Sequence, residues 1–460
     1  MDTKKLRQKI LDLAIHGKLV PQDPNDEPAS VLLERIRAEK EKLIKEGKIK
    51  APKKSKSAGD TSHYPKEGPW ELPEGWCWTT IGDCLINRDG ERIPISSEIR
   101  IKQKNKVFDY YGAAGVIDKV DGYLFAERLL LIGEDGANLL SRAKDNAFFA
   151  EGKYWVNNHA HVLDATRKPL LDYIALYINS IALDPYITGS AQPKLNQDNL
   201  NRIPVPLPPF MEQLRIIDSM AKSQVIIDII AEKQKEIVNA ISLAKSKILD
   251  LAIHGKLVPQ DPSDEPAIDL LKRINPDFRP SDNLHYEGCV PKGWQECRLY
   301  DLFNVTMGQS PNGNTLNKTD GVEFHQGKIY FTEKYLSESS IRTTSPMKYA
   351  TSNSLLCCVR APVGVFNITP RTICIGRGLC ALIPRSEEIN LNYWFYVLCS
   401  YKDYFDAKAT GTTFKAISGE IVRNTIVLMP PMLEQNRILT RITTLFVILD
   451  QISNTINGSE

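Results

Sequence analysis

The stretch KILDLAIHGKLVPQDPNDEPASVLLERI occupies residues 9–36, and it returns almost unchanged as KILDLAIHGKLVPQDPSDEPAIDLLKRI at residues 247–274. Only four positions differ between the two copies, which is too close an agreement to arise by chance. An internal repeat is interpreted before any other pattern, because it determines how a fold is organised. The chain is therefore a duplication that contains the same element twice.

Two weaker pairs of segments extend the repeat. Residues 188–216 (TGSAQPKLNQDNLNRIPVPLPPFMEQLRI) and 410–438 (TGTTFKAISGEIVRNTIVLMPPMLEQNRI) share a TG start, a PPxxEQxRI end and the same length between them. LPEGWCWTTIGDCL at 72–85 likewise matches VPKGWQECRLYDLF at 290–303. Each half of the chain therefore has a helix with its HGKLVPQDP loop, then a variable stretch that opens with a tryptophan, then the TG and PPxxEQ segments and a further helix.

The variable stretches, at about 73–205 and 291–427, otherwise look different from each other. They mix apolar, β-branched runs punctuated by glycine, which are typical of strands and turns, with runs of helical periodicity. The expected strand regions are 123–135 and 353–368, and the expected helices are 168–181 and 390–405. The predicted fold class is α+β, and alike frames around unlike inserts indicate a duplicated scaffold that carries two different specificities.

Long helices are expected beside the variable stretches. From Met211 to Ile253 the later apolar positions follow steps of three and four residues, which is the pattern of a coiled-coil seam. Two prolines precede each EQ segment, as at a helix start, and Gly255 stands where a left-handed cap is expected. The C-terminus repeats the seam from Ile438 to Ile456. A helix of about 40 residues spans about 60 Å, which is long enough to hold two domains apart.

The order of the repeated pieces predicts a circular arrangement. The central helix joins an EQ-type start to a KILDLAIHGKLVPQDP end, whereas the C-terminal helix supplies only the start and the N-terminal helix only the end. The two termini together thus form a second copy of the central element, which predicts a pseudo-twofold axis and two globular domains separated by long antiparallel coiled-coil helices. The expected parts are an N-terminal helical region with a basic linker (1–60), a first variable domain (70–208), a central helical region (209–285), a second variable domain (286–430) and a C-terminal helix (431–460).

The composition is that of an ordinary globular protein, with 42% hydrophobic residues, 25% charged residues and a net charge of +2. No apolar run reaches the roughly 18 residues that cross a bilayer, and the acid-containing N-terminus is no signal peptide, so a cytoplasmic protein without a membrane partner is expected. The nine cysteines form no CxxC pair and are interpreted as buried reduced thiols. Five lysines without an acid in residues 48–56 are either a solvated linker or a tether that contacts phosphate.

The motifs of a DNA-modifying enzyme are missing. Adenine methylation needs an Asn or Asp before Pro-Pro and an aromatic residue, whereas Leu207 and Met429 precede the two proline pairs of this chain and cannot accept a hydrogen bond. The GxxxxGK(S/T) loop that binds ATP and the HExxH pattern of metalloenzymes are both absent from the sequence. No catalytic residue and no cofactor-binding residue is therefore predicted.

Four histidines are candidates for metal ligands or catalytic bases. His16 and His254 precede capping glycines, where a histidine favourably meets the dipole of a helix end. His159 and His161 alternate along an expected strand and so face one side, but further ligands are not found. Packing or DNA contact is preferred for this second pair, and no metal site is predicted.

These repeats resemble the specificity subunit of type I restriction-modification systems. The resemblance covers nearly the whole chain and is carried by the duplicated KILDLAIHGKLVPQDP and PPxxEQxRI segments, the tryptophan-led domain starts, and TGSAQPKLNQ and TGTTFKAIS. It implies two target-recognition domains, each reading one half of a bipartite double-stranded DNA target, on a helical frame that docks two methylation subunits and assembles with restriction subunits. S-adenosylmethionine would then bind the methylation subunits, and ATP and magnesium the restriction subunits.

Residues that read DNA are expected on loops, because bases are recognised by polar side chains while contacts to phosphate position the protein. The DNA-binding candidates are Tyr111, Arg128, Asn138, Gln192, Lys194 and Asn196 in the first domain, and Gln309, Ser310, Arg360, Arg377, Thr413 and Lys415 in the second. Lys194 and Lys415 hold nearly the same place in the two half-repeats, so a shared role at the protein–DNA interface is expected for them. An ordinary surface role is the alternative for each single residue.

Two other classes of function remain open at this point. One is a fused nuclease or methyltransferase that acts alone, against which the missing motifs argue; transfer of labelled methyl groups to DNA by this chain alone would reveal it. The other is a scaffold that joins proteins through its coiled coil without reading DNA. A DNA-binding assay with the partner subunit present would separate the scaffold from the specificity subunit.

Overall fold

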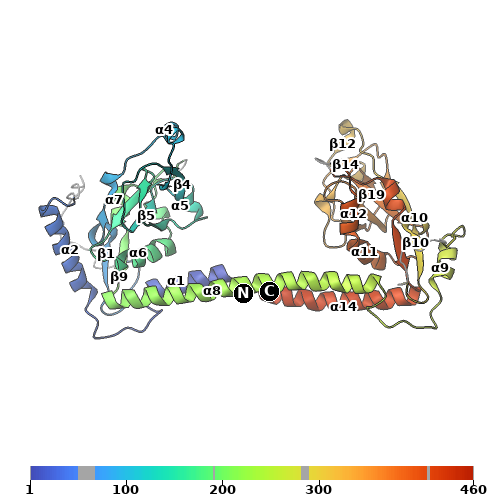
Figure 1. Cartoon of the computed structure of the whole chain (residues 1–460), viewed down its shortest axis with the longest axis horizontal. Helices are drawn as coiled ribbons and strands as arrows, with labels where there is room; N and C mark the ends of the chain where they lie inside the picture. The colour runs from blue at the N-terminus through green and yellow to red at the C-terminus, as the bar shows by residue number, and fades with distance from the viewer. Residues whose placement is uncertain (1, 50–67, 190–191, 281–289, 412–414, 459–460) are drawn as a thin grey trace. The chain divides into compact units, whose positions relative to one another are not determined.

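A computed structural model describes residues 2–49, 68–189, 192–280, 290–411 and 415–458 (Figure 1). Most of the lysine-rich segment and Thr413, one of the DNA-binding candidates, lie outside these residues. The chain divides into two compact units, residues 2–233 and 234–460, and each unit holds one of the two variable stretches. Helix α8 (Phe210–Ile253) contributes residues to both units.

The two HGK segments end helices, as expected. At the end of α1 (Thr3–Ile15), Nδ1 of His16 lies 2.7 Å from the carbonyl oxygen of Asp12, and the next residue is a glycine with a φ of +65°. His254 makes the same contact with Asp250 at the end of α8, also at 2.7 Å, and the glycine after it has the same φ. Both features satisfy carbonyl groups that the last turn of a helix leaves without partners.

The first variable domain contains three sheets. Strands β1 (Cys77–Thr80) and β9 (Pro204–Leu207) form an antiparallel pair beside the helical frame. The central sheet has the order β2 (Ile86–Asn87), β8 (Ala160–Asp164), β5 (Leu129–Gly133) and β6 (Ala147–Ala150). The third sheet has the order β4 (Gly115–Val120), β3 (Phe108–Gly112) and β7 (Tyr154–Val156). The helices are α2 (Ala29–Lys45) in the frame, and α3 (Ile81–Cys84), α4 (Ser97–Lys102), α5 (Asn138–Ser141), α6 (Pro169–Ser180) and α7 (Gln197–Arg202) in the domain.

The second variable domain repeats this plan with one difference. Strands β10 (Gln295–Arg298) and β20 (Ile426–Met429) form the same pair. The central sheet has the order β11 (Phe303–Met307), β19 (Leu379–Pro384), β16 (Ser354–Cys358) and β17 (Phe366–Thr369). The third sheet is larger, with the order β12 (Leu316–Asn317), β14 (Arg342–Thr343), β13 (Val322–His325), β18 (Ile373–Ile375) and β15 (Tyr349–Ala350). The helices are α9 (Ala267–Ile274), α10 (Leu299–Leu302), α11 (Leu391–Ser400), α12 (Lys402–Lys408), α13 (Gly419–Arg423) and α14 (Met432–Asn457).

The elements expected in the variable stretches are confirmed. Strand β5 lies within the first expected strand region, β16 lies within the second, and β17 begins within the second and ends one residue beyond it. Helix α6 covers most of residues 168–181, and α11 with the start of α12 covers residues 390–405. The mixed α/β character of the fold is therefore as predicted. The apolar faces of these helices are buried against the central sheet of their own domain, where Tyr173 and Trp394 are among the largest fully buried side chains.

Helix α1 packs against the first part of α8 in the first unit, and α14 packs against the last part of α8 in the second. The buried side of α1, with Leu11 and Ala14, shares a core with Ile216 of α8. In the second unit Lys245 of α8 lies 2.5 Å from Asp450 of α14. The side-chain amide of Gln234 donates to the carbonyl oxygen of Ile456 at 2.7 Å. From Gln234 to Lys245 the residue number rises along α8, whereas that of the partner on α14 falls from Ile456 to Asp450. This part of α8 therefore runs antiparallel to α14.

Two expectations from composition have structural counterparts. The eight cysteines of the described residues are free, and six of them are buried, as expected of reduced thiols in a core. Within that described part of the chain, no helix has an apolar stretch long enough to cross a membrane.

Candidate nucleic-acid interface

The repeated segments of the first half meet in one joint. The indole Nε1 of Trp76 donates to the buried carboxylate of Glu212 at 3.0 Å. Arg215, one turn further along α8, pairs with Asp26 of the QDPNDEP loop at 2.5 Å. The backbone N–H of Ala29 donates to a carbonyl of the LPEGW segment, that of Gly75, at 2.8 Å. The tryptophan-led start, the EQxR helix start and the loop after α1 are therefore joined as one element.

The second half builds the same joint from its own copies. Trp294 donates to Glu434 at 3.0 Å, and Arg437 pairs with Asp264 at 2.5 Å. Burial raises the pKa of Glu434 above its usual value, although the indole N–H of Trp294 and the charge of Arg437 lower it. The near-identity of the repeated segments thus has a packing reason, because each repeated polar residue has its partner in another repeated segment.

The capping glycine belongs to this joint as well. A Cβ atom on Gly17 would lie 2.5 Å from Cγ of Pro73, and one on Gly255 would lie 2.6 Å from Cγ of Pro291. Both glycines also have a positive φ, which strains any other residue. The HGK and LPEGW segments therefore touch too closely for a side chain, and the joint fixes where each variable domain leaves the helical frame of its unit.

Beyond the joints, the two variable domains pair their backbones in the same register. The corresponding residues, first domain before second, are Glu134 and Val359, Asp135 and Arg360, His159 and Gly378, and His161 and Cys380. Two contacts establish this register beyond the strand ends. The N–H of Glu134 donates to the carbonyl of His159 at 2.9 Å, and the N–H of Val359 donates to the carbonyl of Gly378 at 3.0 Å.

The two lysines that were expected to hold nearly the same place are offset by one residue. In the first domain Lys194 and Thr188 of the TG segment donate backbone hydrogen bonds to each other. In the second domain Ala416 and Thr410 of the TG segment do the same. Lys415 therefore corresponds to Pro193, one residue earlier. Neighbouring residues of an extended segment point to opposite sides. The two lysines thus hold nearly the same place, as expected, but differ by one residue in the backbone register, and each lysine needs a separate argument.

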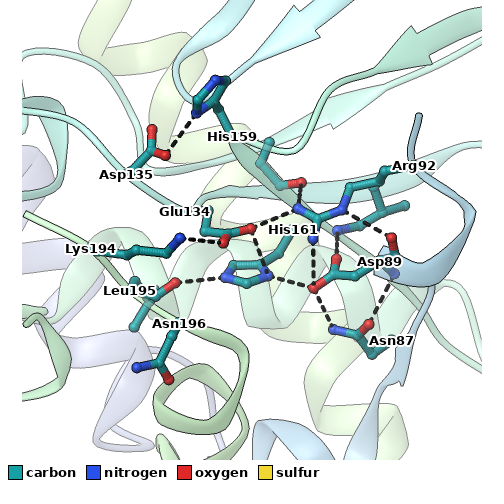
Figure 2. Close-up of polar contacts among 12 residues, drawn as sticks. Asn87, Asp89, Arg92, Glu134, Asp135, His159, His161, Lys194, Leu195 and Asn196 are labelled. Carbon is teal, nitrogen blue, oxygen red and sulfur yellow. Dashed lines mark hydrogen bonds and ion pairs between the residues drawn. The ribbon is translucent and has the colours of Figure 1, made fainter. Parts of the chain in front are cut away.

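A buried network of charges lies behind the TGSAQPKLNQ segment (Figure 2). The ring of His161 is fully buried, with Nδ1 2.6 Å from Oδ2 of Asp89 and Nε2 2.7 Å from the carbonyl oxygen of Leu195. Both ring nitrogens therefore have an oxygen partner within hydrogen-bond distance. Arg92 lies 2.8 Å from Glu134 and completes the network. Burial raises the pKa of Asp89, but the hydrogen bond and charge of His161 and the charge of Arg92 bring it below its usual value.

Two basic side chains face outward from this network (Figure 2). Nζ of Lys194 lies 3.2 Å from Glu134, and the two side chains are 52% and 13% exposed. Nδ1 of His159 lies 2.7 Å from Asp135, with exposures of 47% and 17%. In each pair the carboxylate lies inside and its partner outside. The expectation that His159 and His161 face one side fails, because β8 begins only at Ala160 and the first histidine precedes it.

The second domain has apolar residues where this network stands. Val359 and Cys380 replace Glu134 and His161, and both are buried. Arg360 and Arg377 are exposed, and neither guanidinium forms an ion pair or a hydrogen bond within the described residues. The same backbone frame therefore carries bound charges in one domain and unbound cations in the other.

Comparison with known proteins assigns this duplicated fold. The family model described as "Type I restriction modification DNA specificity domain" matches residues 73–239 and 291–458, one copy on each variable domain and the helix that follows it. The chain belongs to this family. Its role in DNA sequence recognition, and its standing as a specificity subunit rather than an enzyme, were expected from the sequence and are confirmed.

Relatives of this specificity subunit extend over the whole chain. The chain is 27% identical to the EcoEI type I restriction enzyme specificity subunit of Escherichia coli, over 99% of this chain and 91% of that one. It is 31% identical to the EcoAI specificity subunit of Escherichia coli, over 66% of this chain and 63% of that one. A solved structure concerned with complex assembly and conformational transition of the type I R-M system has a TM-score of 0.57 at 22% identity, over 85% of this chain and 95% of that one, which supports the fold.

Two candidates of the first recognition domain have internal partners. Arg128 pairs with Asp172 at 2.5 Å and with Glu151 at 2.8 Å. Asn138 donates to the carbonyl oxygen of Lys144 at 3.1 Å and so shapes the turn after α5. These contacts give both residues a structural task, and their contact with DNA stays a prediction.

The other candidates of the first domain differ in whether their side chains have partners within the protein. The ring of Tyr111 stacks on that of Phe148, with centroids 6.2 Å apart. The side chain of Asn196 accepts from the N–H of Asn199 at 2.8 Å and caps α7. Gln192 is exposed. The TGSAQPKLNQ segment thus begins at the surface with Gln192 and Lys194 and ends in a helix cap.

In the second domain the candidates form two groups. Gln309 is exposed, and Oγ of Ser310 accepts from the backbone N–H of Arg377 at 3.3 Å, so these loops lie side by side. Lys415 pairs with Asp406 of α12 at 2.8 Å on the open surface. The structure therefore brings Gln309, Ser310 and Arg377 together.

Sequence reasoning missed three residues at these loops. A hollow of about 130 Å³ beside Arg360 is also lined by Gln326 and Lys328. His159 was considered, but its place next to Lys194 was not foreseen. The only signal for the first two was a short polar run, QGK at 326–328 after a buried strand, inside an insert that has no counterpart in the repeat.

Proposed function

We propose that each recognition domain reads one half of a bipartite double-stranded DNA target. The observation that carries this proposal is that identical joints hold unlike domains. The Trp76–Glu212 and Trp294–Glu434 contacts are alike, whereas the third sheet has three strands in the first domain and five in the second. A repeated joint presents both domains to DNA in an equivalent way, and the unlike sheets and loops then give each domain its own base preference.

The helices would set the distance between the half-sites. The proposed frame is a pair of antiparallel coiled-coil elements in a pseudo-twofold, circular arrangement, in which α1 and α14 together copy α8. The complementary order of the repeated pieces supports it, as does the Lys245–Asp450 pair within the second unit. Expected domain boundaries remain those of the repeat, with the recognition domains at 70–208 and 286–430.

The frame would also dock the partner subunits. Two methylation subunits are expected, one for each half of the duplication, with restriction subunits joining the assembly. Three exposed apolar side chains within about one turn of α8 support a docking role, because a contiguous exposed apolar patch marks an interaction site: these are Val225, Ile226 and Ile229. S-adenosylmethionine would be held by the methylation subunits, and ATP and magnesium by the restriction subunits, in the cytoplasm. No cofactor is assigned to this chain.

All twelve candidate residues are proposed as DNA contacts, but the support for direct contact differs between them. Gln192, Lys194, Gln309, Arg360 and Arg377 are the strongest, because their side chains are exposed. Arg128 and Asn138 would act through the shape of their loops. Loops on a rigid sheet suit this role, since preorganised side chains lose less entropy on binding.

A domain exchange tests the division of the target. Residues 73–205 are replaced by the matching region of a relative with a different target, and the methylated motifs of the host genome are read before and after. We expect one half of the motif to change and the gap and other half to stay. The reciprocal exchange of residues 291–427 is the matched control and should change only the other half. A change in both halves after either exchange would contradict the proposal.

A further inference from the structure

The two recognition domains expose basic side chains at the same place of the shared fold, but from different residues. We propose that this place, here called the junction surface, is where each domain meets DNA. In the first domain His159 and Lys194 would contact DNA while Asp135 and Glu134 position them. In the second domain Lys328, Arg360 and Arg377 would make the contacts. The inference rests on the proposed reading of DNA and assigns it to a surface.

The junction surface is defined by three segments that meet beyond the central sheet. In the first domain they are residues 134–136 after β5, 157–159 before β8 and 192–195 before α7. In the second domain they are residues 359–361 after β16, 376–378 before β19 and 415–417 before α13. The N–H of Gly136 donates to the carbonyl of Pro193 at 3.1 Å, and the N–H of Ala361 donates to that of Lys415 at 3.1 Å. The backbones therefore coincide, and only the side chains differ.

In the first domain each outward basic group has a carboxylate behind it. Glu134 is held in turn by Arg92, at 2.8 Å, and Arg92 also donates to the carbonyl of Ala160 at 2.6 Å. This support fixes the carboxylate, and the carboxylate fixes Lys194. A half-exposed ammonium with a fixed direction suits a base edge or one particular phosphate oxygen, since less side-chain freedom is lost on binding.

In the second domain the cations stand without such support. Arg360 takes the place of Asp135, and Arg377 stands one residue before the position of His159. Lys328 and Gln326 line the hollow of about 130 Å³ together with Arg360. Within the described residues none of the three cations has an ion pair. Lys328 and Arg360 line the hollow, and Arg377 directly precedes Gly378, which also lines it. Unpaired cations attract phosphate groups, and each phosphate that they neutralise releases counterions from DNA.

In the second domain a glycine brings the segment around Gln326 close to the junction surface. A Cβ atom on Gly378 would lie 2.2 Å from the carbonyl oxygen of Gln326, so no side chain fits there. The equivalent position in the first domain is His159, whose side chain stands outward. The first domain thus presents basic groups paired with carboxylates, and the second presents unpaired cations, at the same place of the fold, which favours a function of the place over a chance cluster of surface charge.

The test measures binding by the full chain assembled with its methylation partner, on duplexes with the genomic target, with either half altered, and with a scrambled sequence, across salt concentrations. His159→Gln, Lys194→Gln, Lys328→Gln and Arg377→Gln should each lower the affinity. Each should also reduce the slope of log affinity against log salt by about one for every phosphate group that the variant no longer neutralises. His159→Lys should restore the slope that His159→Gln reduces.

The positioning residues need a readout that loss of folding would not mimic. Glu134→Gln removes the carboxylate behind Lys194 but keeps its shape, so affinity for scrambled duplex should rise because a nearby negative charge is gone. Affinity for the target should fall, and discrimination at the first half only should drop about tenfold or more. The second half is read by another domain and should be unaffected.

Matched controls lie at the opposite ends of the same strands. Lys168 pairs with Asp164 at the far end of β8, and Arg385 follows the far end of β19. Lys168→Gln and Arg385→Gln should leave affinity and salt slope unchanged. If His159→Gln and Lys328→Gln also leave both unchanged while the unaltered complex distinguishes target from scrambled duplex, the junction surface is wrong and the proposed function stands. If the unaltered complex makes no such distinction, the proposed function itself fails.

Discussion

The two recognition domains share a backbone frame but differ in what that frame buries. At corresponding positions the first domain buries His161 and Glu134 in a charged network, whereas the second buries Cys380 and Val359. The joints below them are the same in both halves. The two halves of the chain therefore keep the contacts that join each domain to its helix, but differ in the buried residues that support the loops.

The buried network of the first domain is a costly way to hold a loop. Buried charges lose hydration, and an apolar core of equal shape is often as stable. What the network adds is direction, because a satisfied set of hydrogen bonds allows only one arrangement. The TGSAQPKLNQ segment is held by a ring nitrogen at the Leu195 carbonyl, whereas the described part of the second domain's loop is held by backbone bonds, apolar packing and the exposed Lys415–Asp406 pair.

The largest expected effect, on the free energy of unfolding, tests whether the two joints contribute equally to stability. Trp76→Ala and Trp294→Ala each remove a buried indole and leave a buried carboxylate without its donor. We expect each change to lower the free energy of unfolding of its own unit by about 3–5 kcal/mol. Denaturant unfolding, followed by hydrogen exchange to assign the unit, measures this. A cost in one half that is several times that in the other would show that the two joints are not equivalent.

The next effect would separate the two domains. His161→Leu leaves the buried Leu195 carbonyl without its side-chain donor and removes one partner of the Asp89 carboxylate, which keeps its contacts with Asn87, Arg92 and the N–H of Val162, and we expect a loss of about 2–3 kcal/mol. Cys380→Ala, at the corresponding position, removes only a small apolar group and should cost about 1 kcal/mol. Thermal unfolding of both variants gives the comparison. Equal costs would mean that the charged network is no more constraining than the apolar packing.

The second domain has a charge cluster of its own in its five-stranded third sheet. Glu323 accepts from Arg371 at 2.5 and 2.7 Å and lies 2.8 Å from Nε2 of His325. Burial raises the pKa of Glu323, but hydrogen bonds from Arg371, the N–H of Ser339 and His325 outweigh burial and lower it to about 2.

This cluster predicts an acid dependence of the second domain that one carboxylate dominates. Because the folded pKa of Glu323 lies below the ordinary 4.5, its carboxylate contributes stability that is complete above the unfolded value and is lost as pH falls towards about 2. We expect Glu323→Gln to cost about 2 kcal/mol near neutral pH, a figure reduced because Arg371 is partly exposed. Unfolding free energies measured at several pH values should show a flatter acid limb for the variant. Two parallel acid limbs would rule out this assignment.

The sequence was informative wherever an interaction is repeated or local. Helices α6, α8, α11 and α14 follow from periodicity and caps, and the joint follows from segments that occur twice. The network could not be foreseen, because Asp89 lies 72 residues before His161 and nothing local links them. The sequence placed Lys194 and Lys415 only nearly alike, and the backbone pairing, which follows the distance from the TG segment, adds that they differ by one residue.

The smallest expected effect concerns the two lysine ion pairs, and it distinguishes a supported lysine from a surface lysine. Lys194 pairs with Glu134, whose side chain is 13% exposed, and Lys415 pairs with Asp406, which is 49% exposed. Exposed pairs are screened by water and salt and contribute about 0.2–1 kcal/mol. We expect a double-mutant cycle of Lys415→Gln with Asp406→Asn to give a coupling at the low end of that range, and to lose it in about 1 M salt.

The cycle of Lys194→Gln with Glu134→Gln should give a larger coupling, about 1 kcal/mol or more, that persists in salt. The physical reason is that Glu134 lies mostly out of water and is already held by Arg92, so little side-chain freedom is lost when the pair forms. Equal couplings in the two cycles would remove the distinction. Lys194 would then be an ordinary surface lysine like Lys415, and the network behind it would serve the stability of the first domain alone.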